Sequence, residues 1–144
     1  MMEGYNATDE LKRVDHLIFV TLKYTRTVDI IRNVLQRLIS ALDYQITDVL
    51  EHFKLKGKLD VLPTVLLVRS KKMEELFPKN KEVKDIIDFY CKLRVIVNSD
   101  YKKKEEYRKN VALVTPKVDV DIEKLKMFAE KTKNYIYYLK ELIE

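Results

Sequence analysis

Hydrophobic residues recur every three or four positions along the first third of the chain, which is the spacing of one face of an α-helix. The segment 8–56 contains no glycine and no proline. Its apolar positions form two stripes, Leu11, Val14, Ile18 and Leu22, then Val28, Ile31, Leu35, Leu38, Leu42, Ile46, Val49 and Phe53. Because steps of three and four run almost unbroken from one stripe into the next, the spacing alone is compatible with a single helix about 70 Å long.

The residues between the two stripes favour a break. Thr25 and Thr27 are β-branched residues that form helices poorly but cap them well, and Asp29 would lie in the first turn of a helix that begins after Thr27. We therefore expect the segment 8–56 to be kinked or broken near Thr25–Thr27. The alternative, one continuous helix, would nearly require a second chain, because a domain of this size offers little to pack against so long a rod.

Turn residues delimit the next element. Gly57 is placed to end the long segment in the left-handed conformation that commonly follows a helix. Pro63 suits the first turn of a helix over 63–77, and Pro78 would stop it. A strand at 65–69 is the competing interpretation.

The second half of the chain contains one clear helix and two ambiguous stretches. Asn80 is a good N-cap for a helix over 81–98. The polar stretch 99–110 is compatible with a loop or with a solvated extension of that helix. Periodicity does not assign the apolar run 111–115, so helix and strand both stay open there.

The last segment repeats apolar residues regularly enough to predict a long helix. Thr115 and Pro116 are expected to start it, with Asp119 and Asp121 near its first turn. Its seam consists of Val118, Ile122, Leu125, Ala129, Thr132, Ile136, Leu139 and Ile143. This alternation of three and four suits helices packed side by side at a shallow angle.

These patterns predict an all-α protein, a bundle of about four to five helices. Only 2 glycines and 3 prolines occur in 144 residues, too few for the turns of a many-stranded β protein. Residues 1–7 are expected to form a flexible tail and residues 8–144 a single helical domain.

Composition and charge narrow the function classes only slightly. The 28 basic and 23 acidic side chains give a net charge of +5, but the two signs are interleaved along the chain. The lysine- and glutamate-rich composition is typical of a thermophilic source. With Cys91 as the lone cysteine, no disulfide can form within the chain. The N-terminus lacks the pattern of a signal peptide and no apolar run could span a bilayer, so we expect a cytoplasmic protein that does not enter the membrane.

Motifs for catalysis, cofactors and metals are missing from the sequence. Two glycines cannot build a glycine-rich phosphate loop, and no serine stands in a nucleophile motif. His16 and His52 are the only histidines. A metal site needs three or four ligands. Asp48, Glu51 and His52 could form one only if another helix added an acidic residue. We therefore expect no catalytic residue, no cofactor and no metal; a buried cluster around His52 would change that expectation.

Basic and aromatic residues alternate in one stretch, 101–109. Rings beside cations can stack on bases and neutralise phosphates, so this stretch is a candidate nucleic-acid site; the alternative is a solvated loop diluted by its two glutamates. The candidate residues are Tyr101, Lys102, Lys103, Lys104, Tyr107, Arg108 and Lys109.

Three tyrosines and three arginines suggest further surfaces. Tyr135, Tyr137 and Tyr138 surround one turn of the last helix, where they could anchor a protein interface or form a second layer of packing within the chain. An anion groove built from Arg26, Arg32 and Arg37 is a further hypothesis.

The stretch "EYRKNVAL" carries a local resemblance to a known family. Arg108 and Asn110 resemble the Arg–Asn start of the motif in HEPN helical domains, a family of RNA-directed toxins and nucleotidyltransferase partners. The ribonuclease motif of that family requires a histidine a few residues later, and no histidine follows position 52. The resemblance implies a non-catalytic relative.

Two functions fit these expectations. The first is a non-enzymatic helical interaction module that forms a homodimer, through the long first segment or the tyrosine-rich last helix. The second is RNA or other polyanion binding through 101–109.

Overall fold

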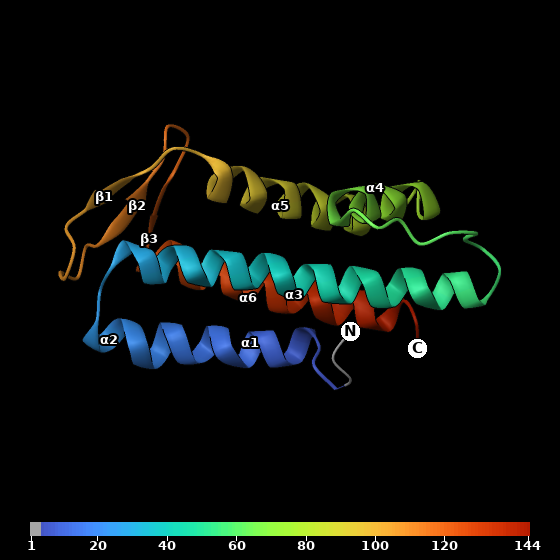
Figure 1. The fold of residues 1–144 in the computed structure, drawn as a ribbon, viewed down its shortest axis with the longest axis horizontal. Coiled ribbons are helices and arrows are strands. Elements are labelled where there is room, and N and C mark those ends of the chain that lie inside the picture. The colour runs from blue at the N-terminus through green and yellow to red at the C-terminus, as the bar shows by residue number, and fades with distance from the viewer. Residues whose placement is uncertain (1–3) are drawn as a thin grey trace.

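The computed structural model describes residues 4–144 and consists of long helices with a small sheet at one end (Figure 1). Helix α1 (Ala7–His16) begins one residue before the expected boundary and continues through a π-helical turn (Leu17–Thr21) into the short α2 (Leu22–Tyr24). Asn6 and Asp9 cap α1 reciprocally, each side chain accepting the other residue's backbone N–H. Residues 1–3 of the expected tail lie outside the described part.

The expected break between the first two helical stretches is confirmed. Thr25 is extended, with φ −136°, and Thr27 is the N-cap of α3 (Val28–Leu55), where its hydroxyl accepts from the amide of Ile30. The chain therefore reverses, so that α1 packs along α3 (Figure 1). Helix α3 ends where Gly57 adopts φ +77°: the amides of Gly57 and Lys58 donate to the carbonyls of Lys54 and Phe53.

Helix α3 is the central rod of the bundle, because α1, α4, α5 and α6 all pack against it. The apolar stripe predicted for this segment is buried almost completely. Six of its eight members have no exposed surface, Val28, Ile31, Leu35, Leu38, Leu42 and Val49; Ile46 is 1% exposed and Phe53 is half-buried.

The helices expected over 63–77 and 81–98 are confirmed, the first with a shifted start. Helix α4 (Leu66–Leu76) occupies the segment for which strand 65–69 was the competing interpretation, and it begins three residues after Pro63. Helix α5 (Lys81–Asn98) begins after Asn80, whose side chain accepts from the amide of Val83 at 3.0 Å.

A three-stranded antiparallel sheet closes one end of the bundle and was not expected. Its strands β1 (Lys102–Lys104), β2 (Ala112–Val114) and β3 (Asp119–Asp121) lie in sequence order. The apolar run 111–115 thus contains the central strand, where Leu113 pairs with Lys103 on one side and Val120 on the other.

The predicted start of the last helix at Thr115–Pro116 is wrong. The Thr115 hydroxyl donates to the carbonyl of Val118 at 2.7 Å and accepts from its amide at 3.0 Å, which closes the turn between β2 and β3. Helix α6 (Ile122–Glu141) starts later, capped by Asp121, which accepts from the amide of Lys124 at 2.7 Å.

Candidate functional site

The basic stretch forms a β-hairpin whose lysines lie on an exposed edge strand. Lys102 and Lys104 are exposed. Lys103 is matched by two carboxylates, Asp29 at 3.5 Å and Glu106 at 3.6 Å, which raise the pKa of its ammonium group. Lysines on an edge strand also prevent pairing with other strands, so their presence alone does not indicate a ligand.

The loop of this hairpin docks onto the break between α2 and α3. The amide of Tyr107 donates to the carbonyl of Arg26 at 2.6 Å. The Glu106 carboxylate accepts from the amide of Val28 at 2.8 Å, so it caps the N-terminus of α3 from 78 positions away. Glu105 and Tyr107 adopt positive φ values of 50° and 68°, a conformation uncommon for residues other than glycine. These contacts join two segments that are distant in sequence.

Two tyrosines project from these joined segments. Tyr24 is 84% exposed and Tyr107 is 74% exposed. Tyr101, by contrast, lies beside the guanidinium group of Arg32, 5.7 Å from the ring centre, and is only 37% exposed. Sequence reasoning did not connect Arg26 with the 101–109 stretch, because only the docked hairpin brings the two segments together.

The three tyrosines of α6 have different environments. Tyr135 packs edge-on against Phe89, with ring centres 5.4 Å apart, and burial raises its pKa. The Tyr138 hydroxyl accepts from the side-chain amide of Asn80 at 2.9 Å. Tyr135 and Tyr138 thus pack within the chain, and only Tyr137 is free to contact a partner, at 67% exposure.

Apolar side chains are exposed around the start of α4. We call this set, Val61, Val65, Leu66, Leu67 and Val68, the α4 apolar surface; all five are exposed, Val61 by 70%. Helix α4 contacts the bundle through its later residues instead, since Ser70 and Met73 have no exposed surface. The apolar residues of 63–77 predict a helix, but their spacing does not predict which of them face the bundle.

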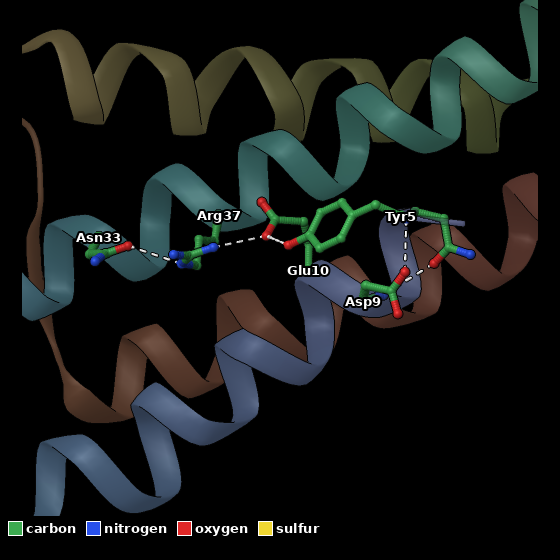
Figure 2. A network of polar contacts seen from close by, with 6 residues as sticks. Tyr5, Asp9, Glu10, Asn33 and Arg37 are labelled. Atoms are coloured by element: carbon green, nitrogen blue, oxygen red, sulfur yellow. Dashed lines mark hydrogen bonds and ion pairs between the residues drawn. The ribbon is translucent and has the colours of Figure 1, made fainter. Parts of the chain in front are cut away.

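A polar network ties the N-terminus to α3 (Figure 2). Glu10 as a whole is 5% exposed, and its carboxylate accepts from the Tyr5 hydroxyl and from Nη1 of Arg37, the latter at 2.9 Å. Nε of Arg37 also donates to Asn33 Oδ1 at 3.2 Å. Arg37 is thereby held in one position by two acceptors.

The hypothetical anion groove of Arg26, Arg32 and Arg37 does not form. Arg32 donates to the carbonyl of Val97 at 3.1 Å, whereas Arg37 is bound to Glu10. Five residues along a helix correspond to a rotation of about 140°, so the two side chains leave α3 on different faces.

A second network links α3 to α5. The hydroxyl of Tyr90, which has no exposed surface, donates to Asp43 Oδ1 at 2.5 Å and accepts from Arg94 at 3.4 Å. Burial raises the pKa of Asp43. Burial and the Asp43 carboxylate together raise the pKa of Tyr90.

The free energy of unfolding of Tyr90→Phe is expected to be lower than that of the wild type. The difference between the two proteins should become smaller above about pH 10. The unfolded chain ionises this hydroxyl near its ordinary pKa while the folded state keeps the proton, so wild-type stability falls as pH rises, by about 1.4 kcal/mol per pH unit. Urea unfolding of both proteins across this range measures the difference, in which the other titrating groups cancel. A stability difference between the two proteins that does not change with pH would contradict the raised pKa of Tyr90.

The candidate metal ligands are not brought together. Throughout 4–144, no group of three His, Cys, Asp or Glu side chains is placed to hold a metal ion. Burial raises the pKa of Asp48. Arg108 and Asn110, the residues that resemble the HEPN motif, lie in the β1–β2 loop.

The chain matches no protein-family model, no curated protein and no solved structure. None of the helices within 4–144 combines the length and the apolar character needed to cross a bilayer.

Proposed function

We propose that this protein is a non-enzymatic helical interaction module that forms a homodimer through the α4 apolar surface. The observation that carries the proposal is the uninterrupted exposure of Val65, Leu66, Leu67 and Val68, together with that of Val61, which precedes the helix. Contiguous exposed apolar side chains mark contact surfaces, because leaving them in water forfeits the free energy of burial.

The geometry favours this surface over the two that the sequence suggested. The apolar stripe of α3 is covered within the chain, and two of the three α6 tyrosines pack internally. A second copy is the proposed partner, since two-fold dimers are the commonest assemblies of soluble proteins. We place this dimer in the cytoplasm, where the lone Cys91 stays reduced.

The double variant Val61→Lys/Val68→Lys is expected to weaken self-association at least about tenfold, because pairing would desolvate the added charges. Both positions are exposed, so the monomer fold is retained. Sedimentation velocity over a series of micromolar concentrations measures the effect. Val95→Lys is the matched control, because Val95 on α5 is 49% exposed and Val68 is 48% exposed. A wild-type protein that stays monomeric throughout, or a control that is weakened equally, contradicts the proposal.

A second candidate function is the binding of single-stranded RNA at the docked hairpin. The hydrogen bond from Tyr107 to Arg26 favours it, because this bond places two exposed tyrosines and two basic segments at one end of the molecule. Exposed rings can stack on unpaired bases of any sequence, while cations contact the phosphates.

Replacing both Tyr24 and Tyr107 by leucine is expected to weaken binding to a labelled single-stranded RNA about tenfold or more, since the rings that stack on bases are lost. Fluorescence anisotropy at low salt measures this. Tyr137→Leu, an exposed tyrosine on α6, serves as the control. Substituting glutamine for Lys102, Lys104, Arg108 and Lys109 should reduce the salt dependence of binding. Equal affinity of the wild type and the leucine variant contradicts stacking.

A further inference from the structure

A hollow of about 640 Å³ lies between α1 and the first half of α3, and no residue of the α4 apolar surface lines it. Three basic side chains line it, Lys12 and Arg13 from α1 and Arg37 from α3. The remaining lining residues are Gly4, Tyr5, Asp9, His16 and Leu17. Basic residues thus outnumber acidic ones on its wall by three to one, which favours an anionic ligand.

Both guanidinium groups of this hollow are held in place by neighbours. Arg37 is fixed by Glu10 at 2.9 Å and Asn33 at 3.2 Å, through Nη1 and Nε, and Nη2 remains as a further donor (Figure 2). Arg13 lies over the ring of Tyr5, with its guanidinium carbon 5.7 Å from the ring centre. Tyr5 therefore serves both, since its hydroxyl donates to Glu10 and its ring supports Arg13. Groups fixed in advance lose little entropy when a ligand binds.

The acidic neighbours are already engaged. Asp9 accepts from the amide of Asn6 at 2.9 Å as part of the α1 cap. Glu10 is buried against Arg37 and Tyr5. Asp9 thus binds within the α1 cap and not to the basic residues of the hollow, whereas Glu10 pairs with Arg37 and offsets one of their charges. His16, one helical turn from Lys12 on α1, adds a further polar group to the same wall.

We propose that this hollow binds the phosphate group of a small organic phosphate. Arg13 and Arg37 provide planar donors that match phosphate oxygens, and Lys12 adds a mobile positive charge. The hollow is within the range of small-ligand sites and larger than a phosphate ion needs, and the Tyr5 ring and Leu17 offer apolar contact for the organic part. Of the three arginines in the sequence hypothesis of an anion groove, only Arg37 lines this hollow, and α1 supplies its other basic residues.

Isothermal titration calorimetry on the full chain tests the proposal. The probes are AMP, glucose 6-phosphate and glycerol 3-phosphate, each paired with its dephosphorylated counterpart, and inorganic phosphate alone. At least one phosphate ester is expected to bind more tightly than inorganic phosphate, and its dephosphorylated counterpart not to bind. Arg13→Gln is expected to weaken that binding about tenfold or more, the effect of losing a charge-assisted hydrogen bond.

Two further variants separate a site from general charge attraction. Arg37→Lys keeps the positive charge but loses the planar donor, so it should also bind more weakly. Lys54→Gln/Lys56→Gln removes charge from exposed positions at the opposite end of α3, about 25 Å or more from Arg37, and should bind like wild type. The proposal is overturned if none of the three esters binds, or if inorganic phosphate binds as tightly as the best ester. It is also overturned if Arg13→Gln or Arg37→Lys keeps the affinity of the wild type, or if the control variant is weakened equally. Circular dichroism confirms that each variant is folded.

Discussion

Leu42→Ala is expected to lower the free energy of unfolding by about 2–5 kcal/mol, the range for a buried leucine truncated in a packed core. Leu42 lies near the middle of α3 and has no exposed surface. The helices around α3 are too firmly packed to close the cavity completely, so the lost contacts are not recovered. Urea unfolding followed by circular dichroism measures the change.

Leu55→Ala provides the matched control, because Leu55 is in the same helix but is 90% exposed. Its change in unfolding free energy is expected to stay within about 0.5 kcal/mol. Similar losses at the two leucines would mean that α3 does not present the face assigned here to the core.

Arg37→Met is expected to lower the free energy of unfolding by about 2–3 kcal/mol, less than for a fully buried ion pair because the Arg37 side chain is 30% exposed. The loss arises because the Glu10 carboxylate, 7% exposed, would remain in the interior without its cation. Urea unfolding at neutral pH measures it.

The double variant Glu10→Leu/Arg37→Met tests this cause directly. Removing the carboxylate together with its partner should recover most of the lost stability, since no uncompensated charge remains. A double variant that is less stable than Arg37→Met would show that the network stabilises the fold through packing or hydrogen bonds, and not through charge compensation.

Local chemistry predicted the start of α3, the end of α3 and the start of α5. Thr27, Gly57 and Asn80 act at the positions expected of them, because a cap satisfies backbone groups through residues only two or three positions away. Apolar periodicity alone did not distinguish a broken from a continuous first segment. The π-helical turn at Leu17–Thr21 and the reversal after Tyr24 allow both stripes to face the same core.

The sheet could not be read from the pattern, because its strands are only three residues long and two of them are polar. β1 consists of three exposed lysines, and it forms a strand because it pairs with β2. Thr115 has the sequence signature of a helix start, yet its hydrogen bonds close a turn with Val118. The secondary structure of such segments depends on pairing with residues that are distant in the sequence, and the neighbouring residues alone do not reveal that pairing.

The candidate sites depend on contacts between distant segments for the same reason. The 101–109 stretch was visible as a charge pattern, but its junction with Arg26 requires the folded hairpin. Arg37 was singled out on α3, whereas its neighbours in the hollow come from α1. The exposure of the α4 apolar surface could not be predicted either, because hydrophobicity does not reveal on which side of a helix the bundle lies.

Hydrogen exchange at low and high protein concentration tests the proposed dimer most directly. Amides in the first turn of α4 have no partner within the helix, so in a monomer they exchange rapidly. We expect exchange across 61–68 to slow at least about tenfold at high concentration, with no comparable change at 135–138. Identical exchange of 61–68 at both concentrations, or protection confined to 135–138, would contradict self-association through the α4 apolar surface.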